Sequence, residues 1–413
     1  MLKKIILMSA YDINPYKGSE SGTGWNFVLQ AASYNRVIAI TRKNNKPNIE
    51  KYIEEFGIEI SNITFHYYDL PYYLRFWKRG ARGSSIYFYL WQMFMPLFVK
   101  NNNIRFDLAH NVNFHADAFP SFLWILRKPV IWGPINHNEK IPKEYINFKK
   151  EYLKDRLKWI VKFINWNYDP FMYLAKKKSD LIIGGNSSVQ KRLGIAESKF
   201  IQLTQVASNK PYKGLGKMSS HQFNVLMVGR FLTIKSFDLG IYSFDNFWSE
   251  LEREERKNVK LTIIGQGPME SYLKEIVAGL ASKENIEFIA WVDKDKIDAF
   301  YKMASVFLFP SHEGAGMVVI EALSNGLPVI CFNNVGPGEF VDDSCAIKIA
   351  YSNYEKSISD YSTAILKLYL DKNLHCKLSN GALDIFEKKY TWDCKGLALK
   401  NIYNELDKKS TNV

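Results

Sequence analysis

Residues 304–331 of the 413-residue chain read ASVFLFPSHEGAGMVVIEALSNGLPVIC. The apolar run Val306–Phe309 is followed by a loop, and residues 317–325 then have helical spacing that Gly326 closes. A second apolar run covers residues 328–331. This order predicts a strand, a loop, a helix and another strand.

The loop before the expected helix, residues 311–316, combines glycines with a carboxylate, Glu313. A helix start offers unpaired N–H groups and a partial positive charge, so this loop suits a phosphate. Glu321 stands in an otherwise apolar helix, where a carboxylate is costly unless its hydrogen bonds are filled. A vicinal diol such as a ribose is a suitable partner. The alternative, a buried loop with a neutralised Glu321, explains neither Glu313 nor the glycines.

These segments resemble a family signature. PSHEGAG at 310–316, EA at 321–322 and GLPV at 326–329 are similar to the retaining GT-B glycosyltransferases of family 4, whose paired glutamates are separated by seven residues. The resemblance implies that Glu313 faces the donor sugar, that Glu321 holds the nucleotide ribose and that no metal is needed. It departs at Ala315, where the family usually carries an aromatic residue. By the same resemblance, the donor site includes Gly314, Gly316, Met317 and Val318.

A second motif supplies cations. The apolar run 223–228 is followed by Gly229 and Arg230, and Lys235 stands near the start of the next expected helix. Arg and Lys at the carboxyl end of a strand suit a diphosphate. The pattern also resembles the family's motif for binding the donor phosphates and stabilising the leaving group, with Ser236 in place of the usual glycine. We therefore expect Arg230 and Lys235 to be catalytic together with Glu313. Without the glutamate loop, the two bases would be interpreted as ordinary surface charges.

Other parts of the chain give weaker donor-site signals. The loop 18–24, GSESGTG, precedes a helix expected from Trp25 and offers Gly22 and Gly24 to an anion. It resembles the GSE-x-G-x-G-W opening of one branch of family 4, in which this loop lies across the cleft from the donor phosphates. By the same resemblance, Trp291 and Val292 occupy positions that lie close to the nucleotide base in members of the family.

Three histidines follow expected strands on the side where ligands bind: His110, His115 and His137. Each is a candidate to face the acceptor, and we prefer His137 as a catalytic residue. A lone histidine is nevertheless more often structural. Gly133 occupies the place where many family members carry a histidine.

Composition and charge limit what we expect of the partners, the cofactors and the cellular compartment. Lys and Arg number 55 against 42 Asp and Glu, a formal net charge of +13, which favours anionic partners without naming one. The four cysteines show no metal-ligand spacing, and the first apolar run is too short for a signal peptide. We expect a cytoplasmic protein with no cofactor beyond a nucleotide-diphosphate sugar and no nucleic-acid partner.

The stretch 71–100 mixes aromatic residues with bases. Its uncharged part, 84–99, is shorter than the ~20 residues of a spanning helix, so we expect a helix packed on its domain. For 72–82, packing on the domain and docking on the inner face of an anionic membrane both remain open. The basic, amphipathic segment 144–178 is expected to be helical, with an interruption at 167–170.

Strands alternate with helices throughout, which predicts an α/β protein with two parallel, doubly wound, Rossmann-like sheets. The resemblance implies the GT-B arrangement, in which the two domains face each other across a cleft. We expect an N-terminal acceptor-binding domain at 1–205, a linker at 206–221 and a C-terminal nucleotide-sugar-binding domain at 222–390. The last helix, 391–413, would cross back to the first domain.

The implied function is retaining transfer of a sugar from a nucleotide-diphosphate donor to a glycan or lipid-linked acceptor, in bacterial surface polysaccharide synthesis. Two enzymatic alternatives, a nucleotide-sugar epimerase and a phosphorylase, would share the phosphate site. A non-catalytic membrane- or polysaccharide-binding protein with the same fold is the third alternative.

Overall fold

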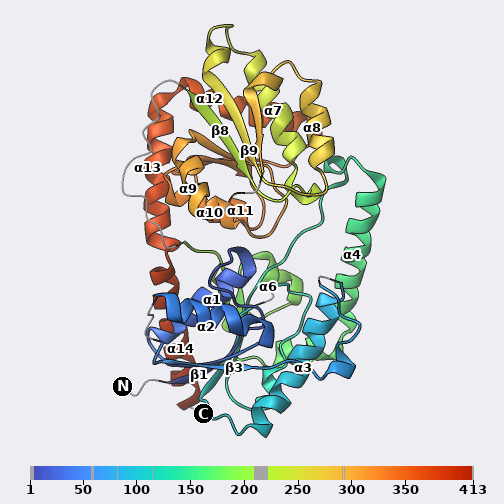
Figure 1. Cartoon of the computed structure of the whole chain (residues 1–413), viewed down its shortest axis with the longest axis vertical. Coiled ribbons are helices and arrows are strands. Elements are labelled where there is room, and N and C mark those ends of the chain that lie inside the picture. The colour runs from blue at the N-terminus through green and yellow to red at the C-terminus, as the bar shows by residue number, and fades with distance from the viewer. Residues whose placement is uncertain are drawn as a thin grey trace. The chain divides into compact units, whose positions relative to one another are not determined.

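The structure is a computed structural model that describes residues 4–56, 60–80, 82–113, 115–208, 222–290, 292 and 294–411. Most of the linker expected at 206–221 lies outside these ranges. The chain forms two compact units, each built on a parallel sheet covered by helices (Figure 1). The first unit comprises Met1–His137, Ile160–Gln205 and Trp392–Val413, and the second comprises Asn138–Trp159 and Val206–Thr391.

The sheet of the first unit has the strand order β3-β2-β1-β4-β5-β6-β7, and its described strand pairs are all parallel. Ile6 of β1 is in register with Val37 of β2 on one side and with Leu108 of β4 on the other. The strands are β1 (Ile5–Ser9), β2 (Arg36–Thr41), β3 (Ile63–Tyr67), β4 (Leu108–Asn111), β5 (Val130–Ile135), β6 (Leu181–Gly184) and β7 (Phe200–Gln202).

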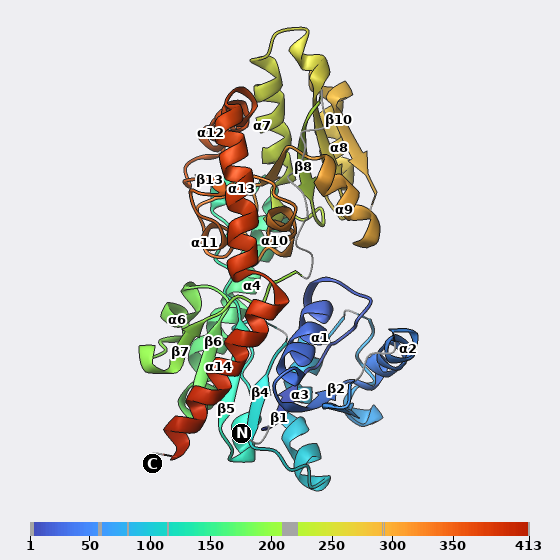
Figure 2. The ribbon, with the colours of Figure 1, turned by 90° about the vertical axis from the view of Figure 1, so that its left-hand side faces the viewer.

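Helices complete the first unit. The expectation that 84–99 packs on its domain is confirmed, because α3 buries an apolar face that includes Tyr87, Trp91 and Met95. Helix α14 lies across the sheet (Figure 2), where the hydroxyl of Tyr403 is 2.8 Å from Nδ1 of His110 in β4. The helices are α1 (Ser19–Ala32), α2 (Lys46–Phe56), α3 (Ser84–Asn101), α5 (Pro170–Lys178), α6 (Ser188–Leu193) and α14 (Trp392–Thr411).

One expectation for the first unit is wrong. The helix expected from Trp25 already begins at Ser19, so Gly22 and Gly24 are buried residues within α1 and not members of a loop. Both glycines permit close packing. A Cβ atom on Gly24 would lie 2.4 Å from Nδ2 of Asn113, and one on Gly22 would lie 2.2 Å from a backbone oxygen of Lys17. The two glycines make tight contacts within α1, and a glycine kept for close packing cannot be told in a sequence from one kept for a phosphate loop. Their expected contact with an anion stays a prediction.

The sheet of the second unit has the order β10-β9-β8-β11-β12-β13, again parallel in every described pair. Alternate residues of β8 point to opposite faces. Val225 and Met227 join one hydrophobic cluster, and Leu226 and Val228 join another. The strands are β8 (Phe223–Val228), β9 (Val259–Ile264), β10 (Ile286–Ile289), β11 (Val306–Phe309), β12 (Val329–Phe332) and β13 (Ala346–Ile349).

Helices cover both faces of this second sheet, as a doubly wound fold requires. Residues of α7 and α12 belong to the first of the two clusters, and residues of α10 and α13 belong to the other. The helices are α7 (Phe237–Ser249), α8 (Glu270–Ala278), α9 (Lys294–Met303), α10 (Met317–Ser324), α11 (Pro337–Phe340), α12 (Tyr354–Leu370) and α13 (Lys372–Lys389).

The segment Asn138–Trp159 packs with the second unit although it follows β5 of the first. We expected residues 1–205 to form one domain. Ile141 and Tyr145 are instead buried in the core of the second unit, where Tyr145 donates a hydrogen bond to the carbonyl of Ser352 at 3.0 Å. The alternation of strands and helices does not indicate that this segment packs with the second unit, because only the tertiary contacts of its side chains show it.

Helix α4 (Lys149–Tyr168) begins within this segment and ends in the part of the chain that belongs to the first unit, and α5 follows it after one residue. Asp169 separates the two helices and caps α5, because its carboxylate accepts a hydrogen bond from the N–H of Phe171 at 2.8 Å. The interruption expected at 167–170 is therefore confirmed. Among the helices of the described ranges, none combines the length and apolar character needed to cross a membrane.

Candidate functional site

The glutamate loop and the GR-x4-K motif lie side by side in the second unit. β8 and β11 are neighbouring parallel strands, so the loops at their carboxyl ends meet at one edge of the sheet. The N–H of His312 donates to the carbonyl of Ile234 at 2.9 Å, and the hydroxyl of Ser311 donates to the same oxygen at 3.3 Å. Two motifs that are far apart in sequence are thus joined by two hydrogen bonds to one backbone carbonyl.

Lys235 and Glu313 form an ion pair at this edge. Nζ of Lys235 is 2.5 Å from Oε1 of Glu313, a charge-assisted hydrogen bond. The same ammonium group lies 5.0 Å from the ring centroid of Phe309, the last residue of β11. The side chains of Lys235 and Glu313 are 13% and 21% exposed, so the pair is held by the protein yet remains open to a ligand.

Arg230 directly follows Gly229, the residue after β8, and its side chain is exposed. Its carbonyl accepts a hydrogen bond from the N–H of Leu232 at 2.8 Å, which shapes the turn toward Lys235. Within the residues that the structure describes, the guanidinium group of Arg230 forms no ion pair. A solvated cation therefore stands five positions before the paired Lys235.

The buried ring of His312 anchors the glutamate loop through stacking and hydrogen bonds. Its ring is buried, stacked at 24° on Phe332 and at 11° on Tyr351. Nδ1 is 2.8 Å from the hydroxyl of Tyr351, and Nε2 is 3.0 Å from the hydroxyl of Ser236. Burial lowers the pKa of His312 to about 3, so the ring is neutral. His312 directly precedes Glu313, and its contact with Ser236 links the glutamate loop to the residue after Lys235. This role was not predicted from the sequence.

Two asparagines hold the other side of the loop. Oδ1 of Asn138 accepts a hydrogen bond from the N–H of Gly314 at 2.7 Å, and Nδ2 of Asn334 donates to the carbonyl of Ser311 at 2.9 Å. Gly336 has a positive φ of 94°, and a Cβ atom there would lie 2.5 Å from the carbonyl carbon of Gly314. No sequence pattern distinguishes these asparagines from other loop residues, so their role could not be predicted from the sequence.

Glu321 is half-buried in α10 and accepts a hydrogen bond from the hydroxyl of Tyr301 at 2.9 Å. Burial and the neighbouring carboxylate raise the pKa of Tyr301 well above its usual value, so the phenol stays protonated and donates. The partial exposure of Glu321 does not match the alternative of a fully buried, neutralised glutamate. Its proposed contact with a ribose stays a prediction.

The remaining expected donor residues border this loop or its helix. Gly316 precedes α10, and Met317 and Val318 form the first turn of α10, partly buried against the apolar core. Val292 is partly buried against the same cluster. Trp291 lies outside the described residues.

The three candidate histidines of the first unit have different surroundings. His110 is fully buried, its Nε2 lies 2.7 Å from the carbonyl oxygen of Gly133, and burial lowers its pKa to about 4. Because Tyr403 occupies its Nδ1, both ring nitrogens of His110 are used within the fold. Nδ1 of His115 is 2.7 Å from the carbonyl of Pro134.

His137 forms a buried pair with Asp117, with Nδ1 2.7 Å from Oδ2. The side chains are 3% and 1% exposed. A carboxylate in this position orients the imidazole ring. The preference for His137 as a residue that faces the acceptor stays a prediction.

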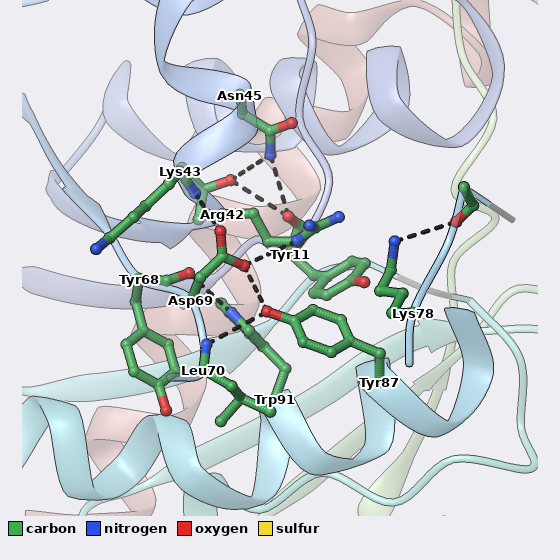
Figure 3. A network of polar contacts seen from close by, with 12 residues as sticks. Tyr11, Arg42, Lys43, Asn45, Tyr68, Asp69, Leu70, Lys78, Tyr87 and Trp91 are labelled. Atoms are coloured by element: carbon green, nitrogen blue, oxygen red, sulfur yellow. Dashed lines mark hydrogen bonds and ion pairs between the residues drawn. The ribbon is translucent and has the colours of Figure 1, made fainter. Parts of the chain in front are cut away.

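A polar network lies at the carboxyl ends of β2 and β3 in the first unit (Figure 3). Asp69 accepts hydrogen bonds from Nε of Arg42 at 3.0 Å and from the hydroxyl of Tyr87 at 2.6 Å. The guanidinium carbon of Arg42 lies 5.2 Å from the ring centroid of Tyr11, and Nζ of Lys78 lies 5.6 Å from that of Tyr87. Because Asp69 balances the charge of Arg42, we assign the network a structural role, anchoring the segment that follows β3.

Comparison with known proteins places these motifs in context. Residues 217–384 match the family model described as glycosyl transferases group 1. An uncharacterized glycosyltransferase of Methanocaldococcus jannaschii is 22% identical over 371 residues, which cover 87% of this chain and 88% of that protein. D-inositol 3-phosphate glycosyltransferase of Streptomyces bingchenggensis is 28% identical over 188 residues, 44% of this chain and 40% of that protein. Three further curated glycosyltransferases are matched over only 38%, 44% and 59% of their own lengths.

Solved structures extend the likeness to nearly the whole chain. Sucrose-phosphate synthase from Thermosynechococcus elongatus superposes with a TM-score of 0.67 at 15% identity, covering 98% of this chain and 100% of that one. The Anabaena protein Alr3699/HepE in complex with UDP gives 0.63 at 14% identity, covering 97% and 100%. The chain therefore has the two-domain α/β fold of GT-B glycosyltransferases, and its residues 217–384 match the glycosyl transferases group 1 family.

Proposed function

We propose that this chain is a retaining, metal-independent glycosyltransferase of family 4 that moves a sugar from a nucleotide-diphosphate donor to an acceptor. The observation that carries the proposal is the ion pair between Lys235 and Glu313 at the carboxyl edge of the second sheet. An acid and a base that approach to 2.5 Å while staying partly exposed are suited to act near one bond, with the base toward the diphosphate and the acid toward the sugar.

The proposed chemistry assigns a role to each charge. Breaking the bond between the anomeric carbon and the diphosphate oxygen leaves negative charge on the diphosphate. Lys235, Arg230 and the N–H groups at the start of α10 would stabilise this charge, an electrostatic role that needs no reorganisation when the reaction occurs. Glu313 would orient the donor sugar and support positive charge at the anomeric carbon. Donor binding would bring the diphosphate to Lys235 as a second anionic partner.

The nucleoside would lie along α10. Glu321 would accept hydrogen bonds from the ribose hydroxyls, and residues 291–292 would approach the base. This half of the proposal is supported by the partial exposure of Glu321 and by the match of residues 217–384 to a glycosyltransferase family.

The acceptor would be a glycan or a lipid-linked sugar held by the first unit, with His137 toward it, in bacterial surface polysaccharide synthesis. Two structural neighbours support this class: one is described as involved in lipopolysaccharide biosynthesis, and another is a complex with UDP and an α-GlcNAc-glycerol. The protein would act at the cytoplasmic face of the membrane.

A thermal-shift screen tests the proposal. Nucleoside diphosphates and their sugars are added to the purified chain, and the ligand that raises the melting temperature is then used in a transfer assay with an acceptor. We expect a product whose anomeric configuration equals that of the donor. Release of a new free nucleotide sugar without acceptor would identify an epimerase instead, and stabilisation by a diphosphate with no turnover of any sugar would favour a binding protein.

A further inference from the structure

Helix α4 carries an apolar stripe that the rest of the described chain leaves uncovered. With 3.6 residues per turn, the stripe falls on one face of a single helix, about 100° wide. Its members are Leu153, Leu157, Ile160, Val161, Ile164 and Tyr168, which are 58%, 53%, 53%, 59%, 49% and 73% exposed.

The stripe is not the face by which the helix packs. Trp166 is 4% exposed, and Nη2 of Arg156 donates to the carbonyl of Ile141 at 2.9 Å, so a different side of α4 contacts the protein. Nζ of Lys140 also lies 3.7 Å from the ring centroid of Trp159. A helix held in place by one face needs no second apolar face to fold, and large apolar stripes exposed to water mark interaction surfaces.

Basic residues border the stripe. Between Lys149 and Tyr168 there are six bases and two acids, a net charge of +4. Both acids are paired with bases of the same helix: Glu151 lies 3.5 Å from Lys154, and Asp155 lies 3.0 Å from Arg156. Helix α5 adds three consecutive lysines at its end and Tyr173, which is 60% exposed.

We propose that α4 docks this protein on an anionic lipid bilayer, lying in the plane of the interface. An exposed apolar stripe flanked by lysines buries its side chains at the acyl boundary while its ammonium groups meet lipid phosphates. The helix cannot span the bilayer, so it lies on the surface. A second copy of the chain is a poorer partner, because its α4 would bring the same positive charges against these.

This surface differs from the segment 72–82, for which the sequence left membrane docking open. Tyr72, Tyr73 and Phe76 are 75%, 71% and 60% exposed, but they surround a single short turn, η2 (Tyr72–Leu74). Lys78 lies over the ring of Tyr87. The two segments carry the same net charge of +4, but helix α4 offers the longer continuous stripe, so we assign the main docking role to α4.

Vesicle flotation of the full chain, without donor or acceptor, tests docking independently of the proposed reaction. We expect binding to vesicles of equimolar phosphatidylglycerol and phosphatidylcholine, and little binding to phosphatidylcholine alone. The variant with Leu153→Gln, Leu157→Gln, Ile160→Gln and Ile164→Gln should partition at least about tenfold less. A matched control with Leu370→Gln and Leu397→Gln, leucines that are 65% and 51% exposed on α12 and α14, should bind as the wild type does.

Charge variants separate lipid from protein partners. Replacing Lys150, Lys154 and Lys158 by Gln should weaken vesicle binding by about fivefold for each lysine, and raised salt should do the same to the wild type. Amide hydrogen exchange of the wild type with vesicles should slow within residues 149–168. Equal binding of the wild type and the leucine-to-glutamine α4 variant would overturn the proposal. The proposal would also be overturned if ultracentrifugation showed a wild-type dimer that the leucine-to-glutamine α4 variant no longer forms, while vesicle binding stays unchanged.

Discussion

The backbone N–H of Gly314 donates a hydrogen bond to Oδ1 of Asn138 at 2.7 Å, across 176 positions of sequence. Asn138 begins the segment that follows β5 and packs with the second unit. The glutamate loop is therefore set partly by a side chain that comes from the N-terminal half of the chain. This contact gives a sequence-distant residue a direct effect on the proposed donor site.

Asn138→Ala should weaken binding of the donor nucleotide about fivefold, because one hydrogen bond to the loop is worth about 1 kcal/mol. Titration calorimetry with the nucleoside diphosphate measures the change. The control is Asn147→Ala in the same segment, since Asn147 donates to Asp238 at 2.7 Å and not to the loop. Equal losses in both variants would mean that the segment, and not the Asn138 contact, matters.

Lys235→Ala and Glu313→Gln should each lower turnover by a factor of about 10² or more, the usual loss when one preorganised charge is removed from a transition state. Lys260→Ala is the matched control. Nζ of Lys260 lies 2.6 Å from Glu287 in an ion pair near the start of β9, away from the strand ends that carry the site. Wild-type turnover in a folded Lys235→Ala protein would remove Lys235 from the mechanism.

Glu321→Ala should lower nucleotide affinity about tenfold or more, since hydrogen bonds to a charged group contribute about 1.5–3 kcal/mol. A double cycle makes the test more specific: the affinities of the wild type and of Glu321→Ala are each measured for the nucleotide and for its deoxyribose analogue. In the wild type, loss of the ribose hydroxyl should reduce affinity, and in the variant it should cost little. If the analogue is discriminated equally by both proteins, Glu321 does not hold the ribose.

His312 should make the protein acid-sensitive. Its pKa is about 3 in the folded state and about 6.5 when unfolded. The unfolded chain therefore binds more protons between these values, and stability falls as pH drops below about 6.5. At pH 5 this group alone accounts for about 2 kcal/mol. Denaturant unfolding of wild type and His312→Gln at pH 7 and pH 5 measures the difference. The variant should lose less stability, and identical losses would contradict the assignment.

Much of the fold was predictable because it depends on local patterns. The run Val306–Phe309 is strand β11 as expected, and the helix expected at 317–325 is α10 at Met317–Ser324. The apolar runs at 223–228 and 328–331 correspond to β8 and β12. Apolar periodicity, glycine stops and strand–helix alternation were enough, since they act over a few residues. The glycines of α1 were expected in a loop and lie in a helix, because tight packing and a phosphate loop favour the same residue.

The sequence by itself determined the α/β fold class and the two motifs that bring Lys235 and Glu313 to the ends of β8 and β11. Only the tertiary structure decided what holds that pair: the buried ring of His312, the amide of Asn138 and the second-unit packing of Asn138–Trp159. It also decided that one apolar face of α4 faces water. The physical reason is that strand and helix preferences are local, whereas burial and long-range hydrogen bonds depend on residues that meet only after the chain has folded.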